Sequence, residues 1–231
     1  MSTAVIIGAG EGLSASLARK LAARGHTLVL SARNVEKLAD LASTTGATCV
    51  EADASNKEDM ARVFEVADAL GAPVEIAIYN PSARVRGGIL ELDPDAVQNA
   101  INTTAFGAFL MAQQAAARML PKGSGTILFT GASAGVKGFP RSSTFAMGKF
   151  ALRGLAQSIA RELHPQGVHI GHFVIDGGIR NPKRPERVDA PDAPDSMLDP
   201  EAIADSYLHF IDQPRSSWAW EIELRPWVER F

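Results

Sequence analysis

The chain has 231 residues, a formal net charge of −3 and 46% hydrophobic residues. This length and apolar content suit one large α/β domain with a substantial core, and the slightly acidic balance argues against broad nucleic-acid binding. The one cysteine, Cys49, excludes an intrachain disulfide, and its apolar neighbours predict a buried structural thiol. No apolar run approaches the ~20 residues of a membrane span, and no targeting signal precedes Thr3. We therefore expect a soluble, cytoplasmic protein without a membrane partner.

Short apolar runs alternate with longer segments of helical spacing along the whole chain. The expected strands are 3–8, 26–31, 47–52, 74–79, 126–130, 168–175 and 219–224. The expected helices are 13–24, 34–45, 55–70, 93–120, 142–163 and 200–211. Asp93 and Pro94 suit the N-cap and first position of the fourth helix. Without a linker or internal repeat, this alternation predicts a single α/β domain over 1–231, with one doubly wound parallel sheet of about seven strands and helices on both faces.

Three glycines, Gly8, Gly10 and Gly12, lie between the first expected strand and the first expected helix. Glycines let backbone amides approach a pyrophosphate closely, and the helix N-terminus adds partial positive charge. Glycines in this pattern indicate a nucleotide site when they follow a strand and precede a helix, as they do here. The pattern favours a dinucleotide site, and a tight turn without a ligand is the alternative.

The residues that follow the second and third expected strands indicate which dinucleotide is bound. A carboxylate after the second strand would accept bonds from a ribose 2′-hydroxyl, but this chain has Ala32 and Arg33. An arginine pairs with a 2′-phosphate in a forked geometry, so we favour NADP(H) over NAD(H); a solvated surface arginine is the alternative. Asp53 follows the third strand and suits either the adenine amino group or the first turn of the next helix.

A segment rich in proline, glycine and charge, 176–196, follows the sixth strand. Long irregular stretches in compact domains are usually lids or flexible loops. We interpret 176–213 as a substrate lid, where specificity for a small molecule would vary.

Taken together, the motifs resemble those of the short-chain dehydrogenase/reductase family over nearly the whole chain. They are Gly8-Ala9-Gly10-Glu11-Gly12-Leu13-Ser14, Asp53, Asn80-Pro81-Ser82, Asn102 and Lys149. The resemblance implies a Rossmann-like fold, and a homodimer or homotetramer through the two long helices at 94–120 and 142–163. Together with Arg33, it implies a cofactor site formed by Gly8, Gly10, Glu11, Gly12, Leu13, Asp53, Ala54, Asn80, Lys149, Gly177 and Ile179.

Several positions depart from the family pattern. The family's catalytic tyrosine, four residues before the lysine, corresponds to Phe145, and its serine corresponds to Ala132 with Ser133 beside it. Ser14 replaces the last glycine of the turn, and Asp176-Gly177 replaces a proline-glycine pair. Proline fixes a turn and removes a donor, so Asp176 would reshape the nicotinamide side of the pocket.

The missing phenol matters because Phe145 and Lys149 share a helix face, one turn apart. In the family's chemistry the lysine lowers the tyrosine pKa and the phenol gives a proton to the carbonyl oxygen. Phenylalanine fills the same volume but has no proton to give, and general acid catalysis contributes about 10²- to 10⁴-fold in rate. Lys149 would then hold the ribose or donate the proton itself. Asn102 would orient a water or only support a bend in its helix.

Two functions remain open from the sequence. The first is an NAD(P)-dependent oxidoreductase acting on an unknown carbonyl- or alcohol-type small molecule, or on an activated double bond, with the proton supplied by Lys149, by water or by the substrate. The second is a catalytically inactive NADP(H)-binding sensor or partner subunit. The five histidines are scattered without metal-ligand spacing, so no metal site is expected.

Overall fold

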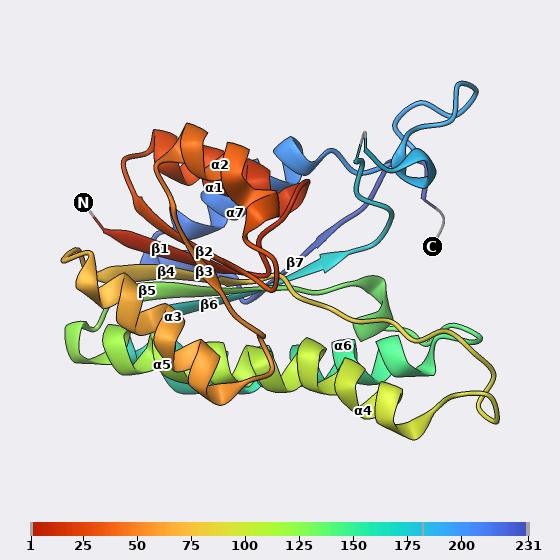
Figure 1. Ribbon diagram of the computed structural model, residues 1–231, viewed down its shortest axis with the longest axis horizontal. Coiled ribbons are helices and arrows are strands. Elements are labelled where there is room, and N and C mark those ends of the chain that lie inside the picture. The colour runs from red at the N-terminus through yellow and green to blue at the C-terminus, as the bar shows by residue number, and fades with distance from the viewer. Residues whose placement is uncertain (1, 182, 230–231) are drawn as a thin grey trace.

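The computed structural model describes residues 2–181 and 183–229 and contains one seven-stranded sheet between two helical layers (Figure 1). Every strand pairing is parallel, and the strand order is β3-β2-β1-β4-β5-β6-β7. The strands are β1 (Thr3–Ile7), β2 (Thr27–Ala32), β3 (Thr48–Glu51), β4 (Val74–Tyr79), β5 (Gly125–Thr130), β6 (Val168–Ile175) and β7 (Glu221–Leu224). The predicted doubly wound α/β fold is confirmed.

The helices cover both faces of this sheet. They are α1 (Leu13–Ala23), α2 (Ala39–Thr45), α3 (Lys57–Ala69), α4 (Pro94–Ile101), α5 (Gly107–Met119), α6 (Ser143–Leu163) and α7 (Pro200–Ile211). Short turns of 3₁₀ or π type lie at η1 (Glu36–Leu38), η2 (Asn102–Phe106), η3 (Leu120–Lys122), η4 (Ser133–Gly135), η5 (His164–Gln166), η6 (Pro185–Arg187) and η7 (Arg215–Ser217). Helices α1, α2 and α7 lie on one face of the sheet and α3 to α6 on the other (Figure 1).

Alternating side chains of the strands build two separate cores. Along β1, Val5 and Ile7 are fully buried in the core that includes α3, α5 and α6. Ala4 and Ile6 point the other way, into the core that includes α1, α2 and α7. Because neighbouring residues of a strand face opposite sides, a parallel strand covered on both faces is apolar throughout. This explains why the strands read as continuous apolar runs.

The strand order reverses beside β1, which lies between β2 and β4. In open α/β sheets, ligands bind in the crevice at the carboxyl ends of the strands at such a point. The amide of Ala9 donates to the Ser31 carbonyl at 2.8 Å, and the amide of Asn80 donates to the Ile7 carbonyl at 3.1 Å. The fold therefore brings the glycine turn to the ends of β2 and β4.

The predicted helix over 93–120 is interrupted by the π turn η2. Its start is as expected, because the Asp93 carboxylate accepts the amides of Asp95 and Ala96, with Pro94 in the first turn. The extra residue of a π turn disturbs the regular helical hydrogen bonds, and here the buried Tyr79 hydroxyl donates to the Thr103 carbonyl at 2.5 Å. The period of the apolar residues did not reveal this interruption.

The predicted lid over 176–213 contains two different structures. Residues 200–211 form α7, which packs on α1, with Ile203, Tyr207 and Phe210 buried in the core. Residues 176–199 contain a short parallel bridge between Ile179 and Leu198, although no such contact was expected in a loose segment. Only 176–199 therefore has the character of a loop over the site.

Three smaller expectations can also be compared with the structure. Cys49 is only partly buried, because it lies on the edge strand β3, so the prediction of a buried thiol was wrong. No helix among the described residues is long and apolar enough to cross a membrane. Within the same residues no group of three or more histidine, cysteine or acidic side chains could hold a metal ion.

Candidate active site and dinucleotide cleft

The glycine turn has backbone geometry that an anion could occupy. Gly8 has a φ of +74°, and a Cβ atom there would lie 2.6 Å from Pro81 Cγ, so no other residue fits. A Cβ on Gly10 would meet nothing within 4 Å, which leaves its backbone open to a ligand. Gly12 caps α1 without a side-chain hydrogen bond, and the first turn contains no acid. The free amides and positive end of α1 thus suit the pyrophosphate of a dinucleotide.

Ser14 has a structural role at the position where the family pattern has glycine. Its buried hydroxyl donates to the Gly8 carbonyl at 3.2 Å and lies 2.6 Å from Asn80 Nδ2, which donates to it. This chain of hydrogen bonds joins the glycine turn to the end of β4. The substitution therefore keeps the turn in place.

Arg33 and Asp53 lie beyond the ends of β2 and β3, at the same edge of the sheet as the glycine turn. Arg33 is exposed and has no hydrogen-bond or ion-pair partner among the described residues. Asp53 Oδ1 accepts both the amide and the hydroxyl of Ser55, at 2.8 and 2.7 Å. The turn before α3 thus already uses the Asp53 carboxylate, while a nucleotide role for either side chain stays a prediction. Neighbouring Ala54 is buried.

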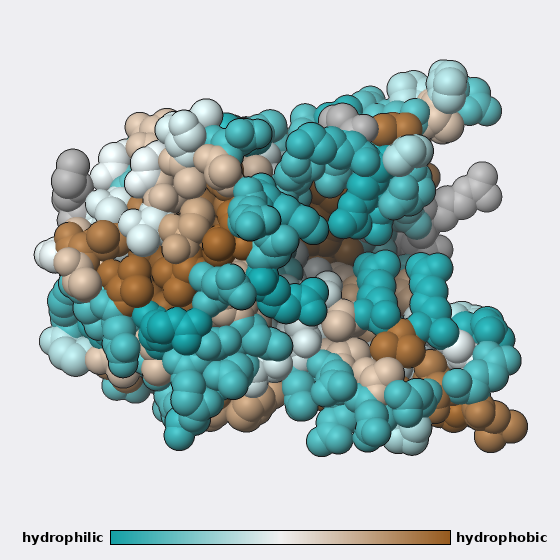
Figure 2. Space-filling view, viewed as in Figure 1, coloured by the Kyte–Doolittle hydropathy of each residue, from teal (hydrophilic) through white to brown (hydrophobic). Residues whose placement is uncertain are grey.

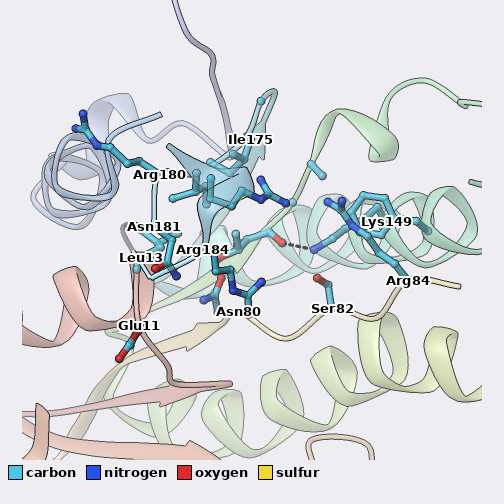
Figure 3. Close-up of a pocket in the computed structure, with 18 residues that line it drawn as sticks. Glu11, Leu13, Asn80, Ser82, Arg84, Lys149, Ile175, Arg180, Asn181 and Arg184 are labelled. Atoms are coloured by element: carbon cyan, nitrogen blue, oxygen red, sulfur yellow. Dashed lines mark hydrogen bonds between the residues drawn. The ribbon is translucent and has the colours of Figure 1, made fainter. Parts of the chain in front are cut away.

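Lys149 is a buried amine beside the carboxyl end of β5. It is 2% exposed, and Nζ donates to the Thr130 carbonyl at 2.6 Å (Figure 3). Burial, followed by the charge of Arg84, lowers the pKa of Lys149 to about 7. An amine with this pKa can both lose and gain a proton near neutral pH, which suits general acid–base chemistry.

Phe145 lies one helical turn before Lys149, and its ring faces two cations. The Arg84 guanidinium carbon is 3.9 Å from the ring centroid, and Lys149 Nζ is 5.9 Å from it. The ring also packs with Ala132 and Ala134 in a small apolar cluster. Arginine stacking on an aromatic face is a favourable contact, so the ring holds the Arg84 guanidinium close to the Lys149 amine.

Two adjoining hollows open at this edge of the sheet, where Figure 2 shows a cleft bordered by hydrophilic side chains. The inner hollow, of about 250 Å³, extends from the glycine turn to Lys149 (Figure 3). It is lined by these expected residues: Glu11, Gly12, Leu13, Asn80, Ala132, Phe145, Lys149, Gly177 and Ile179. The outer hollow, of about 470 Å³, shares Arg84, Ala132, Phe145, Ile175 and Gly177 with the inner one and adds Ser133.

The remaining expected residues line neither hollow. They are Gly8, Gly10, Arg33, Asp53, Ala54 and Asn102. Asn102 begins the π turn η2. Thr104 of the same turn packs closely against α6, because a Cβ added at Gly148 would lie 2.9 Å from Thr104 Cβ. This placement fits the support of a helix bend better than direct contact with a substrate.

Comparison with known proteins decides the family. Residues 2–184 match the family model described as short chain dehydrogenase. The chain belongs to that family. A short-chain dehydrogenase from Rhodopseudomonas palustris is 35% identical, with a TM-score of 0.84 over 98% of this chain and 99% of that one. A metagenomic short-chain oxidoreductase in complex with NADP is 25% identical, with a TM-score of 0.82 and 97% of each chain covered. An uncharacterised oxidoreductase of Staphylococcus aureus (strain USA300) is 26% identical over 96% of each chain.

Family membership makes the chain a short-chain dehydrogenase-type oxidoreductase built on a nicotinamide-binding fold. In this fold the backbone of Asp176 also takes part in the sheet, which the sequence did not indicate. Its amide donates to the Leu224 carbonyl at 2.9 Å and so extends the pairing of β6 with β7. A proline could not make this bond. The adjacent Gly177 is closely packed, since a Cβ there would lie 2.9 Å from Pro226 Cδ.

Sequence reasoning missed the basic side chains of this short-chain dehydrogenase cleft. The inner hollow is lined by Arg84, Arg180, Arg184 and Arg187, and the outer one by Arg84, Arg86 and Arg141. Lys183, in the same loop as Arg180, forms an ion pair with Glu11 of the glycine turn. The available signals were the alternation Arg84-Val85-Arg86 and the cluster of basic residues at 180–187.

Proposed function

We propose that this protein is an NADP(H)-dependent oxidoreductase that interconverts a carbonyl and an alcohol on a small molecule, with Lys149 as its acid–base group. One observation carries the proposal: Lys149 is buried beside Phe145 at the inner hollow, and its pKa lies near 7. A side chain with a pKa near the working pH transfers protons most efficiently.

Each residue of the cleft has a role in this proposal. The open backbone at Gly10 and the N-terminus of α1 hold the pyrophosphate. When bound, the reduced nicotinamide supplies the hydride. The carbonyl oxygen takes a proton from the Lys149 amine, which becomes neutral and is protonated again from water. Phe145 and Ala132 exclude water from the reacting carbon, and the loop 176–199 closes over the substrate.

The first experiment separates binding from turnover. Purified protein is titrated with NADPH and with NADH, and a panel of carbonyl compounds is then screened for loss of NADPH absorbance. We expect NADPH binding together with turnover of at least one compound. If the protein bound neither NADPH nor NADH, the proposal would be refuted.

A second candidate is a catalytically inactive NADP(H)-binding sensor or partner subunit. The apolar cluster of Ala132, Ala134 and Phe145 favours it, because these side chains offer no hydroxyl at the place where a carbonyl oxygen would lie. Tight NADPH binding without turnover across a broad panel would support this candidate over the first.

Arg33→Ala tests the choice between NADPH and NADH. We expect NADPH binding to weaken by about 10- to 100-fold, the loss of a charge-assisted contact, and NADH binding to change little. Fluorescence titration of both cofactors measures the difference. Lys122→Ala is the control, because exposed Lys122 precedes β5 and so lies at the opposite edge of the sheet. Equal weakening of NADPH and NADH would contradict a 2′-phosphate contact.

We also propose that the protein forms a homodimer or homotetramer through the outer surfaces of α5 and α6. Phe109 on α5 and Phe150 on α6 are 43% and 46% exposed, and Phe106 stacks on Phe109 with ring centroids 6.1 Å apart. Exposed apolar groups of this size are typical of interfaces. Phe109→Glu with Phe150→Glu is expected to yield a monomer by light scattering, whereas Leu90→Glu, a change at an exposed loop residue, leaves the assembly intact. A monomeric wild type at micromolar concentration would refute the proposal.

A further inference from the structure

The outer hollow has an unusual charge for a chain whose net charge is −3. Three arginines line it, Arg84, Arg86 and Arg141, and none of its lining residues is acidic. Ser133 and Ser142 add two hydroxyl groups to the same wall. A hollow lined by guanidinium and hydroxyl donors, with no acidic residue among its lining, is complementary to an anion.

Arg84 is held in place by its backbone and by an aromatic ring. The amide of neighbouring Ala83 donates to Thr104 Oγ1 of the π turn at 3.1 Å, which fixes the start of the loop. The guanidinium then stacks 3.9 Å from the centroid of Phe145, and Figure 3 shows Arg84 and Lys149 converging in the same part of the cleft. Ring stacking leaves the N–H groups at the edge of the guanidinium free to bind a ligand.

Arg84 and Arg86 lack the partners that surface arginines usually have. Neither forms an ion pair or hydrogen bond with a carboxylate among residues 2–181 and 183–229. Burial, and then the charges of Arg187 and Arg86, lower the pKa of Arg84. Collecting like charges around one hollow is unfavourable in the free protein, and a bound anion would relieve the repulsion.

Arg141 differs from these two. Its guanidinium donates to Glu91 at 2.8 Å, and Glu91 also accepts the Gly88 amide at 2.8 Å. This ion pair ties the loop that contains Arg84 and Arg86 to the segment before α6. Arg141 thus shapes the rim, and the charges left for a ligand are those of Arg84 and Arg86.

We infer that Arg84 and Arg86 bind a carboxylate or phosphate group of the substrate, which is therefore an oxo acid or the corresponding hydroxy acid. Because Arg84 Cζ and Lys149 Nζ contact the same ring, at 3.9 and 5.9 Å from its centroid, they are separated by no more than the sum of these distances. One small molecule can therefore reach both groups, with its anion at Arg84 and its carbonyl at Lys149. Arg86 lines only the outer hollow, which includes no residue of the glycine turn, and Arg84, which lines both hollows, stacks on Phe145. On this placement we assign both arginines to the substrate rather than to the cofactor phosphates.

This inference rests on the proposed function for the carbonyl, so its test measures binding as well as turnover. Acetoacetate, 2-oxobutyrate and levulinate are each compared with their methyl esters, and dihydroxyacetone phosphate with dihydroxyacetone. Isothermal titration is carried out with the free protein and with NADP⁺ present, and kcat/KM is measured with NADPH. We expect at least one acid to bind about 10- to 100-fold more tightly than its neutral counterpart, and Arg84→Gln with Arg86→Gln to abolish the difference.

Arg161→Gln is the matched control. Arg161 is exposed on α6, 12 residues beyond Lys149 and therefore about 18 Å along the helix. It is expected to leave the preference for acids unchanged, and Arg84→Lys to retain part of it.

The outcomes separate the inference from the proposed function. Selective anion binding without turnover would support the anion site while refuting the oxidoreductase. Turnover of neutral carbonyls, with no acid preferred, would refute the site and leave the oxidoreductase standing. NADPH binding that weakens in Arg84→Gln as much as acid binding would also overturn the inference, because the arginines would then serve the cofactor. The acid preferred in the panel distinguishes a carboxylate from a phosphate.

Discussion

Lys149→Met is expected to lower carbonyl reduction by about 10²- to 10⁴-fold, the usual contribution of a general acid. In the wild type, the pKa of Lys149 near 7 means that the amine is protonated below this pH and neutral above it. Reduction needs the proton, so its kcat is expected to be constant below pH 7 and to fall as the pH rises. Alcohol oxidation needs the neutral amine and should show the opposite profile. Methionine has a similar length without a charge, and its residual rate should not follow this profile.

Lys149→Met is also expected to change how the free energy of unfolding depends on pH. The pKa of Lys149 in the folded protein lies below its ordinary value of 10.5 because of burial. Between these two values the unfolded chain binds more protons, so the free energy of unfolding rises with pH from about 7 to 10.5. Lys149→Met should lack this rise when urea midpoints are compared at neutral and alkaline pH. A wild type whose reduction rate and stability both ignore pH in this range would refute the role of Lys149.

Much of the fold could be predicted from the sequence because its signals are local. Runs such as Val5 to Ile7 are apolar without a break, as a parallel strand buried on both faces requires. The glycine turn and the cap at Asp93 also depend on neighbours in the chain. The π turn η2 did not follow from such signals, because its extra residue is stabilised by Tyr79, which comes from a different strand.

The candidate site was predictable only in part for the same reason. Gly12, Asn80 and Lys149 could be placed because each lies at a fixed position relative to a strand or helix. Arg84 could not, since its direction depends on a hydrogen bond between Ala83 and the π turn, and on stacking against Phe145. The position of a charged side chain in a loop depends on the path of the loop, which the pattern of apolar residues does not specify.

Phe145 consequently has more than a space-filling role in our interpretation. A phenol at this place would supply a proton, whereas the phenyl ring supplies a surface on which the Arg84 guanidinium stacks. The proton then has to come from the amine of Lys149, whose pKa is lowered by burial and by the nearby charge of Arg84. The missing phenol, the Arg84 guanidinium without an ion pair among the described residues, and the lowered pKa of Lys149 are connected in this way through the Phe145 ring.

Phe145→Tyr combined with Ala132→Ser should raise carbonyl reduction by about 10²-fold or more, within the range that a general acid contributes. The Phe145 ring lies 3.9 Å from Arg84 Cζ and 5.9 Å from Lys149 Nζ. Cations this close favour the charged form of a phenol and so lower its pKa. The added hydroxyl groups would point into hollows that Phe145 and Ala132 already line. The rate is measured as NADPH oxidation with the best compound of the carbonyl panel.

Ala151→Ser is the control for the added hydroxyl, because it lies on α6 two residues beyond Lys149 and is exposed on another side of the helix. It should leave the rate unchanged. A triple variant tests whether the new phenol is the proton donor. If the phenol becomes the acid, adding Lys149→Met to the double variant should cost less than Lys149→Met costs in the wild type. No gain in rate from the double variant, with NADPH binding intact, would mean that more of the pocket than its proton source has changed.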